Sequence, residues 1–336
     1  METKWIKPTE VKIGVELLKA GEVIAMPTET VYGLAGDATN DVAIRKIFEA
    51  KGRPADNPLI VHVASVEQAG HFAQTIPPVA KRLMEAFWPG ALTIILPSNG
   101  RASSLVTAGL DSIGLRMPDH DAALDLIRSS GLGLAAPSAN RSGRPSPTSA
   151  KHVADDLSGR IAGIMDGGPT GIGVESTVID CMTEPATILR PGGVTKEAIE
   201  AVIGPVNLDA NLNDETAAPR SPGMKYTHYA PSAPLYLVDG GRDDLVQIVT
   251  ARKEAGKRVG ALVFDEEPTP ADVTLSLGRS METAAQRLYE ALRKFDETDV
   301  EEIYVNRIEP TGVALAVYNR LYKAAGGKVV RSHEEA

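Results

Sequence analysis

The sequence has 336 residues, which is more than one domain usually contains and about right for two. Hydrophobic residues make up 43% and charged residues 24%, an ordinary composition for a folded protein, and an aromatic share of only 4% predicts an aliphatic core. The net charge of -9 disfavours tight, non-specific binding of nucleic acid.

The single cysteine, Cys181, cannot form an internal disulfide bond, which favours a reducing compartment. Residues 1–5 lack the apolar segment of a secretory signal peptide. No uninterrupted apolar run approaches the ~20 residues that a membrane-spanning helix needs. We therefore expect a cytoplasmic protein without membrane contacts, in which Cys181 packs as a small apolar residue.

The first two thirds of the sequence alternate strand-like and helix-like segments. Short apolar runs predict strands at residues 23–26, 59–63, 92–96, 113–116, 133–136 and 177–180. Asp41 is the expected cap of a helix that runs through Phe48, and residues 79–88 predict a helix that ends at a Pro-Gly pair. Because no simple strand–helix–strand period repeats, we expect an α/β fold with a twisted mixed sheet and helices.

A polar, proline-rich stretch at residues 205–223, PVNLDANLNDETAAPRSPG, has the composition of a linker. Beyond it we expect strands at residues 235–238, 259–264 and 303–305 and helices at 243–255, 284–295 and 313–325. This alternation predicts a smaller, parallel, Rossmann-like α/β domain, although Asp239-Gly240-Gly241 is not a dinucleotide-binding fingerprint. The predicted division is an N-terminal domain (1–204), a linker (205–233) and a C-terminal domain (234–336).

Two basic side chains stand close together in the run AKGRPADNP, residues 50–58. Its glycine and prolines predict a tight loop directly after a helix, from which Lys51 and Arg53 project. Arginine offers a fork for phosphate oxygens, and lysine a compact positive charge. Such a pair alone is most often a solvated turn, but this loop leads straight into an apolar strand, and rigidly held loops often carry binding sites. We interpret it as a grip on a phosphate-bearing substrate.

Five further segments carry polar or charged side chains, some beside predicted strands, one on a Pro-Gly turn and one at the end of the linker. They are PTETVYGL (27–34), PSANRSG (137–143), GVESTVID (173–180), LRPGG (189–193) and SPGMKYTHYAP (221–231). In the first, Glu29 is a candidate metal ligand or the cap of a following helix. Each segment alone is a weak signal, since a turn of serine and asparagine is usually only a turn.

The sequence carries no motif of a covalent catalyst. It has no Gly-x-Ser-x-Gly elbow and no Walker loop, and its six histidines lack the spacing of a zinc site. His62, on a predicted strand, is by spacing alone more often structural than functional.

Taken together and in order, the segments PTETVYGL, KGRPADNPLIVHV, GLRMP, APSANRSG, ESTVID, LRPGG and SPGMKYTHYAP resemble the L-threonylcarbamoyladenylate synthase family, with its YrdC-like domain. More narrowly, the sequence is similar to the longer branch that has an additional C-terminal Sua-type domain. The resemblance covers residues 21–193 and the linker up to Pro231, while the C-terminal part fits by position and length. It implies that residues 1–204 are catalytic and that the linker carries an active-site lid.

The resemblance implies a nucleotidyltransferase that joins L-threonine, bicarbonate or CO2, and ATP into L-threonylcarbamoyl-AMP and releases pyrophosphate. A downstream threonylcarbamoyl-transferase complex then modifies the adenosine at position 37, beside the anticodon, of tRNAs that read codons beginning with A. Such an enzyme needs no nucleophile of its own, because the carbamate of threonine attacks the α-phosphorus. Positioning and charge stabilisation are then the task of the protein.

The resemblance also implies which residues bind each substrate. Lys51 and Arg53 are the expected catalytic pair, on the ATP phosphates. The implied ATP-binding set is Lys51, Arg53, Asn57, Ser112, Ser138, Asn140, Ser146, Arg190 and Tyr229. The implied threonine-binding set is Thr30, His62, Arg116, Ala136 and Ser176, with Arg116 pairing the threonine carboxylate. Tyr229 is expected to belong to a lid that excludes water, and Mg2+ to bridge the phosphates without a dedicated cage of protein side chains.

Three alternatives remain open on the sequence. The first is an RNA-binding module whose concave sheet presents Lys51, Arg53, Arg116, Arg141, Arg144 and Arg190, although the negative net charge and the few aromatic residues disfavour it. The second is a carbamoyltransferase maturation domain, which usually lies in a longer chain with zinc-finger-like cysteines. The third is a regulatory nucleotide-binding protein. Direct binding of tRNA also stays open.

Overall fold

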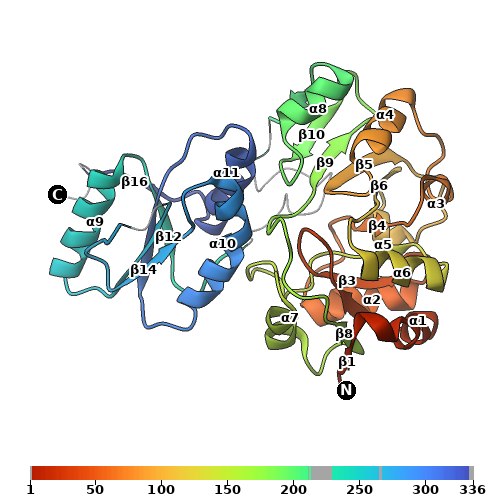
Figure 1. The fold of residues 1–336 in the computed structure, drawn as a ribbon, viewed down its shortest axis with the longest axis horizontal. Helices are drawn as coiled ribbons and strands as arrows, with labels where there is room; N and C mark the ends of the chain where they lie inside the picture. Colours follow the sequence, from red (N-terminus) through yellow and green to blue (C-terminus); the bar gives the residue numbers. More distant parts are fainter. Residues whose placement is uncertain (1, 211, 213–228, 265–266, 333–336) are drawn as a thin grey trace. The chain divides into compact units, whose positions relative to one another are not determined.

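The computed structural model describes residues 2–210, 212, 229–264 and 267–332, and the chain divides into two compact units (Figure 1). The first unit comprises Met1–Ser142 and Ser146–Lys225, and the second comprises Gly143–Pro145 and Tyr226–Ala336. Gly143–Pro145 thus belongs by its contacts to the second unit, although the sequence on both sides of it belongs to the first. Most of the SPGMKYTHYAP segment, residues 221–228, lies outside the described residues.

Within the described residues, eleven strands of the first unit form one sheet, which confirms the predicted mixed α/β fold (Figure 1). Their order across the sheet is β1 (Lys4–Ile6), β8 (Gly163–Met165), β2 (Ile24–Met26), β3 (Gly33–Asp37), β7 (Leu134–Ala135), β4 (Ile60–His62), β6 (Ser112–Arg116), β5 (Leu92–Pro97), β9 (Thr177–Asp180), β10 (Thr187–Arg190) and β11 (Asn207–Leu208). Parallel and antiparallel neighbours are combined, since β4 runs parallel to β6 and antiparallel to β7.

Capping residues or prolines begin several helices of the first unit, and glycines end some of them. In the part of this unit that the structure describes, they are η1 (Pro8–Glu10), α1 (Val11–Lys19), α2 (Asp41–Lys51), α3 (Val66–Gly70), α4 (Pro78–Phe87), α5 (Ser104–Thr107), α6 (Asp121–Ser130), α7 (Ala150–Leu157) and α8 (Lys196–Ile203). The prediction that Asp41 caps α2 is wrong, because Asn40 is the cap. Asn40 has the extended backbone of a capping residue, and its Oδ1 accepts hydrogen bonds from the N–H groups of Val42 and Ala43.

Strand β2 of the first sheet is buried on both faces. Ile24 and Met26 of β2 lie in one apolar cluster, which includes Leu18 of α1, whereas Val23 and Ala25 lie in another, which includes Ile47 of α2. Successive side chains of a strand point to opposite faces of its sheet. A strand with an apolar core on both sides of its sheet therefore needs apolar residues at consecutive positions, as residues 23–26 have.

The start of the predicted linker belongs to the sheet. The N–H of Asp209 bonds to the carbonyl oxygen of Ile188 at 3.0 Å, and β11 pairs with β10 in parallel. The predicted linker, residues 205–233, thus begins with a short strand that pairs with the first unit's sheet. Both side chains of β11 are exposed, so no apolar alternation marks this edge strand in the sequence.

The described part of the second unit contains a five-stranded, entirely parallel sheet, which confirms the Rossmann-like prediction. The strand order is β14 (Val273–Ser276), β13 (Val259–Val263), β15 (Glu302–Asn306), β12 (Leu235–Val238) and β16 (Val329–Val330), and the helices are α9 (Arg242–Glu254), α10 (Met281–Phe295) and α11 (Val313–Ala324). α10 buries the predicted face of Ala284, Leu288, Leu292 and Phe295. Among the helices described for both units, none combines the length and apolarity needed to cross a bilayer.

Candidate active site

Lys51 is the last residue of α2, and only 3% of its surface is exposed. Its Nζ donates hydrogen bonds to the carbonyl oxygens of Ser138 and Asn140, the second at 2.8 Å. The prediction that Lys51 projects from a loop is therefore wrong, because the helix continues through it and ends at Gly52, whose φ of 64° suits glycine. Burial, together with the positive charge on Arg53, lowers the pKa of Lys51 to about 7.

Arg53 lies in the loop that follows α2 and is half-buried. Its Nη2 donates to the carbonyl oxygen of Asn57 at 3.4 Å, and the Asn57 side chain is fully buried. An open hollow of ≈ 450 Å³ is lined by Arg45, Phe48, Glu49, Gly52, Arg53, Pro54 and Ala55. Arg53 is therefore accessible to a ligand, while Asn57 is part of the support of the loop.

The segment after β7 holds three of the residues that the resemblance assigns to ATP. The main-chain carbonyl oxygens of Ser138 and Asn140 accept the hydrogen bonds from Lys51 that are described above. Ser146 is fully buried, and its Oγ donates to Glu175 Oε1 at 2.6 Å. The sequence marks Glu175 only as part of the GVESTVID segment, because no local pattern connects it with Ser146.

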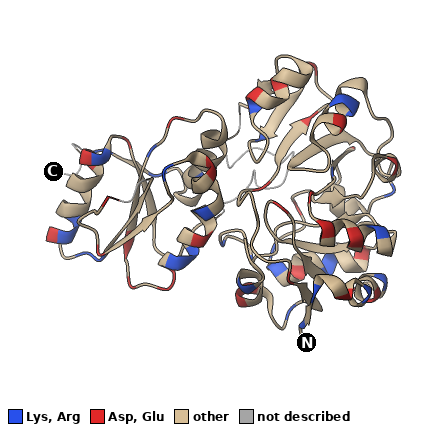
Figure 2. Ribbon diagram, in the orientation of Figure 1, with Lys and Arg blue, Asp and Glu red and all other residues tan. Residues whose placement is uncertain are grey.

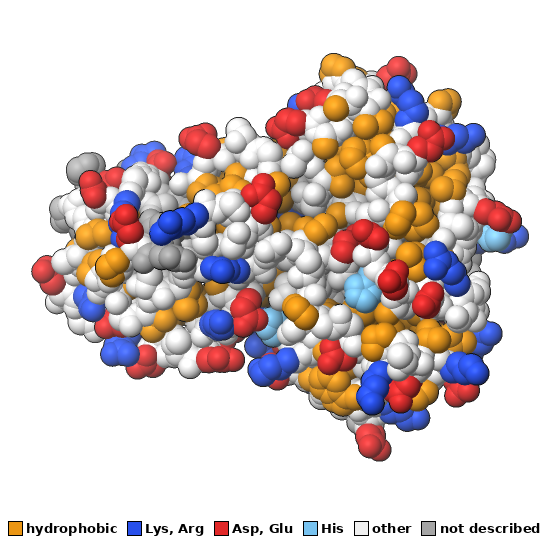
Figure 3. Space-filling model, viewed as in Figure 1, with side chains coloured by type: hydrophobic (Ala, Val, Ile, Leu, Met, Phe, Trp, Pro, Cys, Tyr) orange, Lys and Arg blue, Asp and Glu red, His pale blue; other side chains and the backbone are white. Residues whose placement is uncertain are grey.

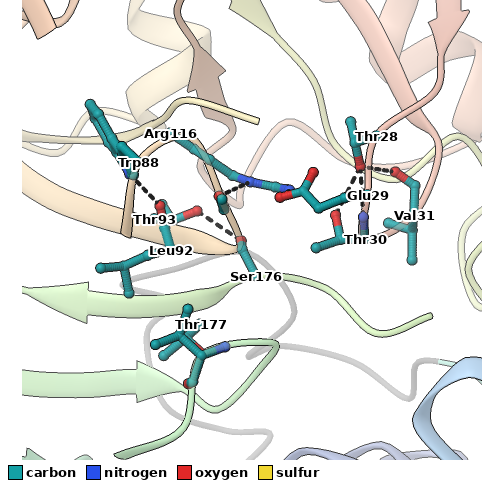
Figure 4. Close-up of polar contacts among 12 residues, drawn as sticks. Thr28, Glu29, Thr30, Val31, Trp88, Leu92, Thr93, Arg116, Ser176 and Thr177 are labelled. Atoms are coloured by element: carbon teal, nitrogen blue, oxygen red, sulfur yellow. Dashed lines mark hydrogen bonds and ion pairs between the residues drawn. The ribbon is translucent and has the colours of Figure 1, made fainter. Parts of the chain in front are cut away.

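Arg116, at the end of β6, forms a buried ion pair with Glu29. Its Nη2 lies 2.6 Å from Glu29 Oε1, and its Nε donates to the carbonyl oxygen of Gly90 at 3.2 Å. Figure 4 shows the guanidinium group pointing at the carboxylate. The alternative in which Glu29 caps a following helix is wrong, because the next element is β3.

His62 of β4 is directly in register with Arg116 on the neighbouring strand β6. Its imidazole is buried, and its Nδ1 has no hydrogen-bond partner among the described residues. Burial and the nearby charge of Arg116 lower the pKa of His62 to about 3. His62 is therefore neutral near pH 7 and adds no second positive charge beside Arg116.

Thr30 and Ala136 approach this region from two further elements. The Oγ1 atoms of Thr30 and Thr28 are 2.9 Å apart, and Thr30 directly follows Glu29 (Figure 4). Ala136 directly follows β7, and its N–H donates to the carbonyl oxygen of Ile60 at 2.9 Å, on the strand that carries His62. The implied threonine-binding residues thus lie on neighbouring strands or on the segments joined to them.

Ser176 and Arg190 are in direct contact. Arg190 Nη2 donates to the carbonyl oxygen of Ser176 at 2.9 Å and to its Oγ at 3.2 Å, and the Ser176 Oγ lies 2.8 Å from Thr93 Oγ1 (Figure 4). The resemblance assigns Ser176 to threonine and Arg190 to the nucleotide, and the structure places the two residues together. Ser112 begins β6, the strand whose other end carries Arg116.

Tyr229 belongs to the second unit and is 5% exposed. Its ring centroid lies 5.3 Å from that of Tyr289, and the Arg320 guanidinium lies over the Tyr229 ring at 5.6 Å. Its backbone has a φ of 67°, a left-handed conformation that is uncommon for a residue with a side chain. Its predicted role in a lid over the nucleotide stays a prediction.

Charge on the surface of the described residues is mixed in sign. Figure 2 shows basic and acidic residues on the same helices, and α8 carries Lys196, Glu197 and Glu200. An RNA backbone would be expected to select a continuous positive stripe. This mixture gives little support to the RNA-binding alternative.

A second hollow, of ≈ 520 Å³, is lined by none of the predicted site residues. Its lining consists of Pro77, Pro78, Val79, Arg82, Cys181, Met182, Thr183, Glu184, Pro185, Ala186, Ile203 and Pro205. Figure 3 shows hydrophobic side chains gathered on the face of the first unit over α4 and α8. Cys181 is buried among them, and burial raises the pKa of its thiol to about 12, which agrees with the prediction that it packs as an apolar residue.

Comparison with known proteins identifies the chain. Residues 16–192 match the Sua5/YciO/YrdC family model, described as "Telomere recombination", and residues 194–326 match the model described as "Threonylcarbamoyl-AMP synthase, C-terminal domain". The sequence is 56% identical to the threonylcarbamoyl-AMP synthase of Bacillus subtilis, over 94% of this chain and 92% of that protein. It is 46% identical to the enzyme of the same name from Pyrococcus abyssi, over 97% of each.

Solved structures agree with these sequence relatives. The crystal structure of P. abyssi Sua5 complexed with L-threonine superposes with a TM-score of 0.94 at 44% sequence identity, over 99% of this chain and 100% of that one. The fold and the relatives together define the class of the protein, which is an enzyme of the nucleotidyltransferase type. The chain belongs to the threonylcarbamoyl-AMP synthase family, in its two-domain form.

Proposed function

We propose that this chain condenses L-threonine, bicarbonate or CO2, and ATP into L-threonylcarbamoyl-AMP and pyrophosphate. The observation that carries the proposal is the arrangement of polar groups on three neighbouring strands. His62 on β4 is in register with Arg116 on β6, and Ser176 contacts Thr93 on β5, the strand on the other side of β6. Together they offer a neutral imidazole, a cation and a hydroxyl to a small polar molecule. Support comes also from the P. abyssi relative, whose crystal structure is described as complexed with L-threonine. The carboxylate of threonine requires a cation, and its hydroxyl requires a hydrogen-bonding partner.

The first step of the proposed reaction forms a carbamate. The threonine ammonium group loses a proton, its nitrogen bonds to the carbon of bicarbonate, and water leaves, so that one carbamate anion, one water and one proton result. We assign Thr30, His62, Arg116, Ala136 and Ser176 to the binding of threonine. Neutral His62 serves as a hydrogen-bonding group here, since its pKa of about 3 keeps it from competing with Arg116 for a carboxylate.

In the second step a carbamate oxygen attacks the α-phosphorus of ATP. The bond from this phosphorus to the oxygen bridging to the β-phosphorus breaks, and pyrophosphate leaves. We assign Lys51 and Arg53 to the phosphates, and Asn57, Ser112, Ser138, Asn140, Ser146, Arg190 and Tyr229 to the remaining contacts with ATP. Lys51 is already held by two carbonyl groups, so its ammonium group is positioned before the substrate binds.

Mg2+ enters this proposal as part of the substrate, MgATP. Within the described residues, no group of three or more His, Cys, Asp or Glu side chains is arranged to hold a metal ion. We propose that phosphate oxygens and water carry the ion, which is how Mg2+ is commonly bound. Tyr229 and the linker at residues 205–233 are proposed to close over the nucleotide, because water destroys both the carbamate and the mixed anhydride.

We further propose that the product serves tRNA modification in the cytoplasm. Threonylcarbamoyl-AMP is an activated acyl donor, so the reaction that consumes it transfers the acyl group to a nucleophile. The expected acceptor is the adenosine at position 37 of tRNAs that read codons beginning with A, and the expected catalyst is a separate threonylcarbamoyl-transferase complex.

Pyrophosphate release tests the proposed function. The purified chain with L-threonine, bicarbonate, ATP and Mg2+ is expected to release pyrophosphate and form a threonylcarbamoyl nucleotide that mass spectrometry detects. Omission of threonine or bicarbonate should abolish both signals. Arg53→Ala should lower kcat/KM by about 10²–10³ with unchanged thermal melting, because it removes a charge that stabilises the phosphate groups of ATP in the transition state. Equal pyrophosphate release without threonine refutes the assignment.

A further inference from the structure

The Glu29–Arg116 ion pair leaves much of its hydrogen-bonding capacity unused. Apart from the ion pair, neither carboxylate oxygen of Glu29 has a hydrogen-bond partner among the described residues, and the same is true of Arg116 Nη2. The two side chains are 13% and 5% exposed. A carboxylate accepts up to about four hydrogen bonds, and leaving acceptors unpaired in a buried place is costly. A ligand with several N–H donors would therefore gain more at Glu29 than at a satisfied carboxylate.

The main chain around both charged groups is, in contrast, firmly held. The carbonyl oxygen of Glu29 accepts from the N–H of Ile172 at 2.8 Å, and that of Thr30 accepts from Gly173 at 3.2 Å. Arg116 lies on a strand between two neighbours, β4 and β5. The main chain on both sides is therefore fixed, and the contact between the two side chains is the one that an entering ligand would have to replace.

The charges of the Glu29–Arg116 pair are complementary to those of a free amino acid. The ion pair itself consists of one positive and one negative group, and neutral His62, in register with Arg116, adds no charge to it. A free amino acid also carries one of each, a carboxylate and an ammonium group. If it enters between Glu29 and Arg116, each of the four charges meets an opposite partner, and no buried charge is left alone. Glu29 then also faces the three N–H donors of the ammonium group.

We propose that Glu29 binds the ammonium group of L-threonine, and that the Glu29–Arg116 ion pair opens to admit the amino acid between its two members. The identity of the amino acid rests on the proposed function, and Glu29 adds a residue to the implied threonine-binding set. The closed pair selects for a ligand that carries both charges. A ligand with only a carboxylate leaves Glu29 without a partner, and a ligand with only an ammonium group leaves Arg116 without one.

Calorimetric titration of the full chain with three ligands tests whether the site selects ligands that carry both an ammonium group and a carboxylate. The ligands are L-threonine, (2S,3R)-2,3-dihydroxybutanoate, which has no ammonium group, and L-threoninol, which has no carboxylate. We expect L-threonine to bind the wild-type protein at least about tenfold more tightly than either analogue. If the dihydroxy acid binds as tightly as threonine, the proposal fails without recourse to any variant.

Substitution at Glu29 tests the assigned partner. Glu29→Gln is expected to lose about tenfold or more in affinity for L-threonine but to bind the dihydroxy acid as well as the wild type or better, because Arg116 is released from its competitor. Glu29→Asp should restore part of the preference for threonine. Glu22→Gln is the matched control, since it removes a carboxylate that pairs with Lys46 at 2.7 Å in the same unit, and should change neither affinity.

Two results with Glu29→Gln would overturn the proposal. The first is an equal loss of affinity for threonine and for the dihydroxy acid, which would mean that Glu29 only orients Arg116. The second is unchanged threonine affinity in a variant that melts like the wild type. Failure of the proposed function gives a different result, in which the wild type binds another amino acid in place of threonine. The affinities of the wild type and of Glu29→Gln are then compared for that amino acid and its deaminated analogue.

Discussion

The Nζ of Lys51 lies 2.8 Å from the carbonyl oxygen of Asn140, so the end of α2 is tied to the segment that follows β7. The same ammonium group donates to Ser138. A basic side chain expected to bind phosphate is therefore also part of the internal structure of the site. Substitution at Lys51 should consequently affect both stability and activity.

Lys51→Ala removes the donor for two main-chain carbonyl oxygens. We expect the free energy of unfolding to fall by about 1–3 kcal/mol, measured by urea denaturation, because buried acceptors lose their partner. The kcat/KM for pyrophosphate release should fall by about 10²–10³. Lys19→Ala is the matched control, since Lys19 occupies the last turn of α1 but is exposed. Unchanged stability in Lys51→Ala would assign the lysine to the substrate alone.

Because the pKa of His62 is lowered in the folded protein, we expect the free energy of unfolding to depend on pH. Its pKa in the folded protein is lowered from 6.5 to about 3, so between these values the unfolded chain binds the proton and the folded protein does not. The contribution of His62 to stability is complete above pH 6.5 and is lost progressively as the pH falls toward 3. His62→Gln should flatten the decline of unfolding free energy over this window, by on the order of 2–4 kcal/mol.

Urea denaturation at pH 7 and at pH 4 measures the effect of His62→Gln. His71→Gln provides the comparison, because the His71 side chain is exposed. An equally steep decline in wild type and His62→Gln would contradict the lowered pKa.

Arg190→Lys separates two roles of this arginine. Arg190 Nη2 reaches both the carbonyl oxygen and the Oγ of Ser176, and a lysine has no guanidinium fork with which to do so. We expect the KM for ATP to rise, because Arg190 is assigned to the nucleotide. We expect the KM for threonine to rise as well, by about tenfold, because the hydroxyl of Ser176 loses its fixed orientation. Separate titrations of threonine and ATP in steady-state kinetics check this. A rise confined to the KM for ATP would show that the contact of Arg190 with Ser176 is not needed for the binding of threonine.

Tyr229 is tested with two substitutions. Tyr229→Ala removes a ring that packs near Tyr289 and beneath Arg320, so the second unit should lose about 3 kcal/mol of stability. The same change should raise the KM for ATP if Tyr229 belongs to the lid. Tyr229→Phe keeps the ring and removes only the hydroxyl, so a rise in its KM for ATP at a temperature where the variant is fully folded reports a contact made by the hydroxyl. An unaltered KM in both variants would remove Tyr229 from the ATP site.

Much of the fold could be predicted from local patterns. The apolar runs at residues 23–26 and 92–96 predicted strands in the right places, and the spacing of Leu288 and Leu292 predicted the buried face of α10. These predictions hold because burial of one or two faces imposes a period on the residues themselves. The family, too, follows from the order of short motifs along the chain, and the comparisons with known proteins confirm it.

By itself, the sequence determined the α/β class, the parallel second sheet and the family of this protein. Only the tertiary structure decided that Lys51 points inward, that Glu29 pairs with Arg116, and that Gly143–Pro145 belongs to the second unit. Each of these facts depends on groups that are far apart in the sequence and meet only when strands and helices have packed. Hydrophobic periodicity predicts which face of an element is buried, but it does not predict which polar group lies against a given side chain. The chemistry of this site depends on those polar partners.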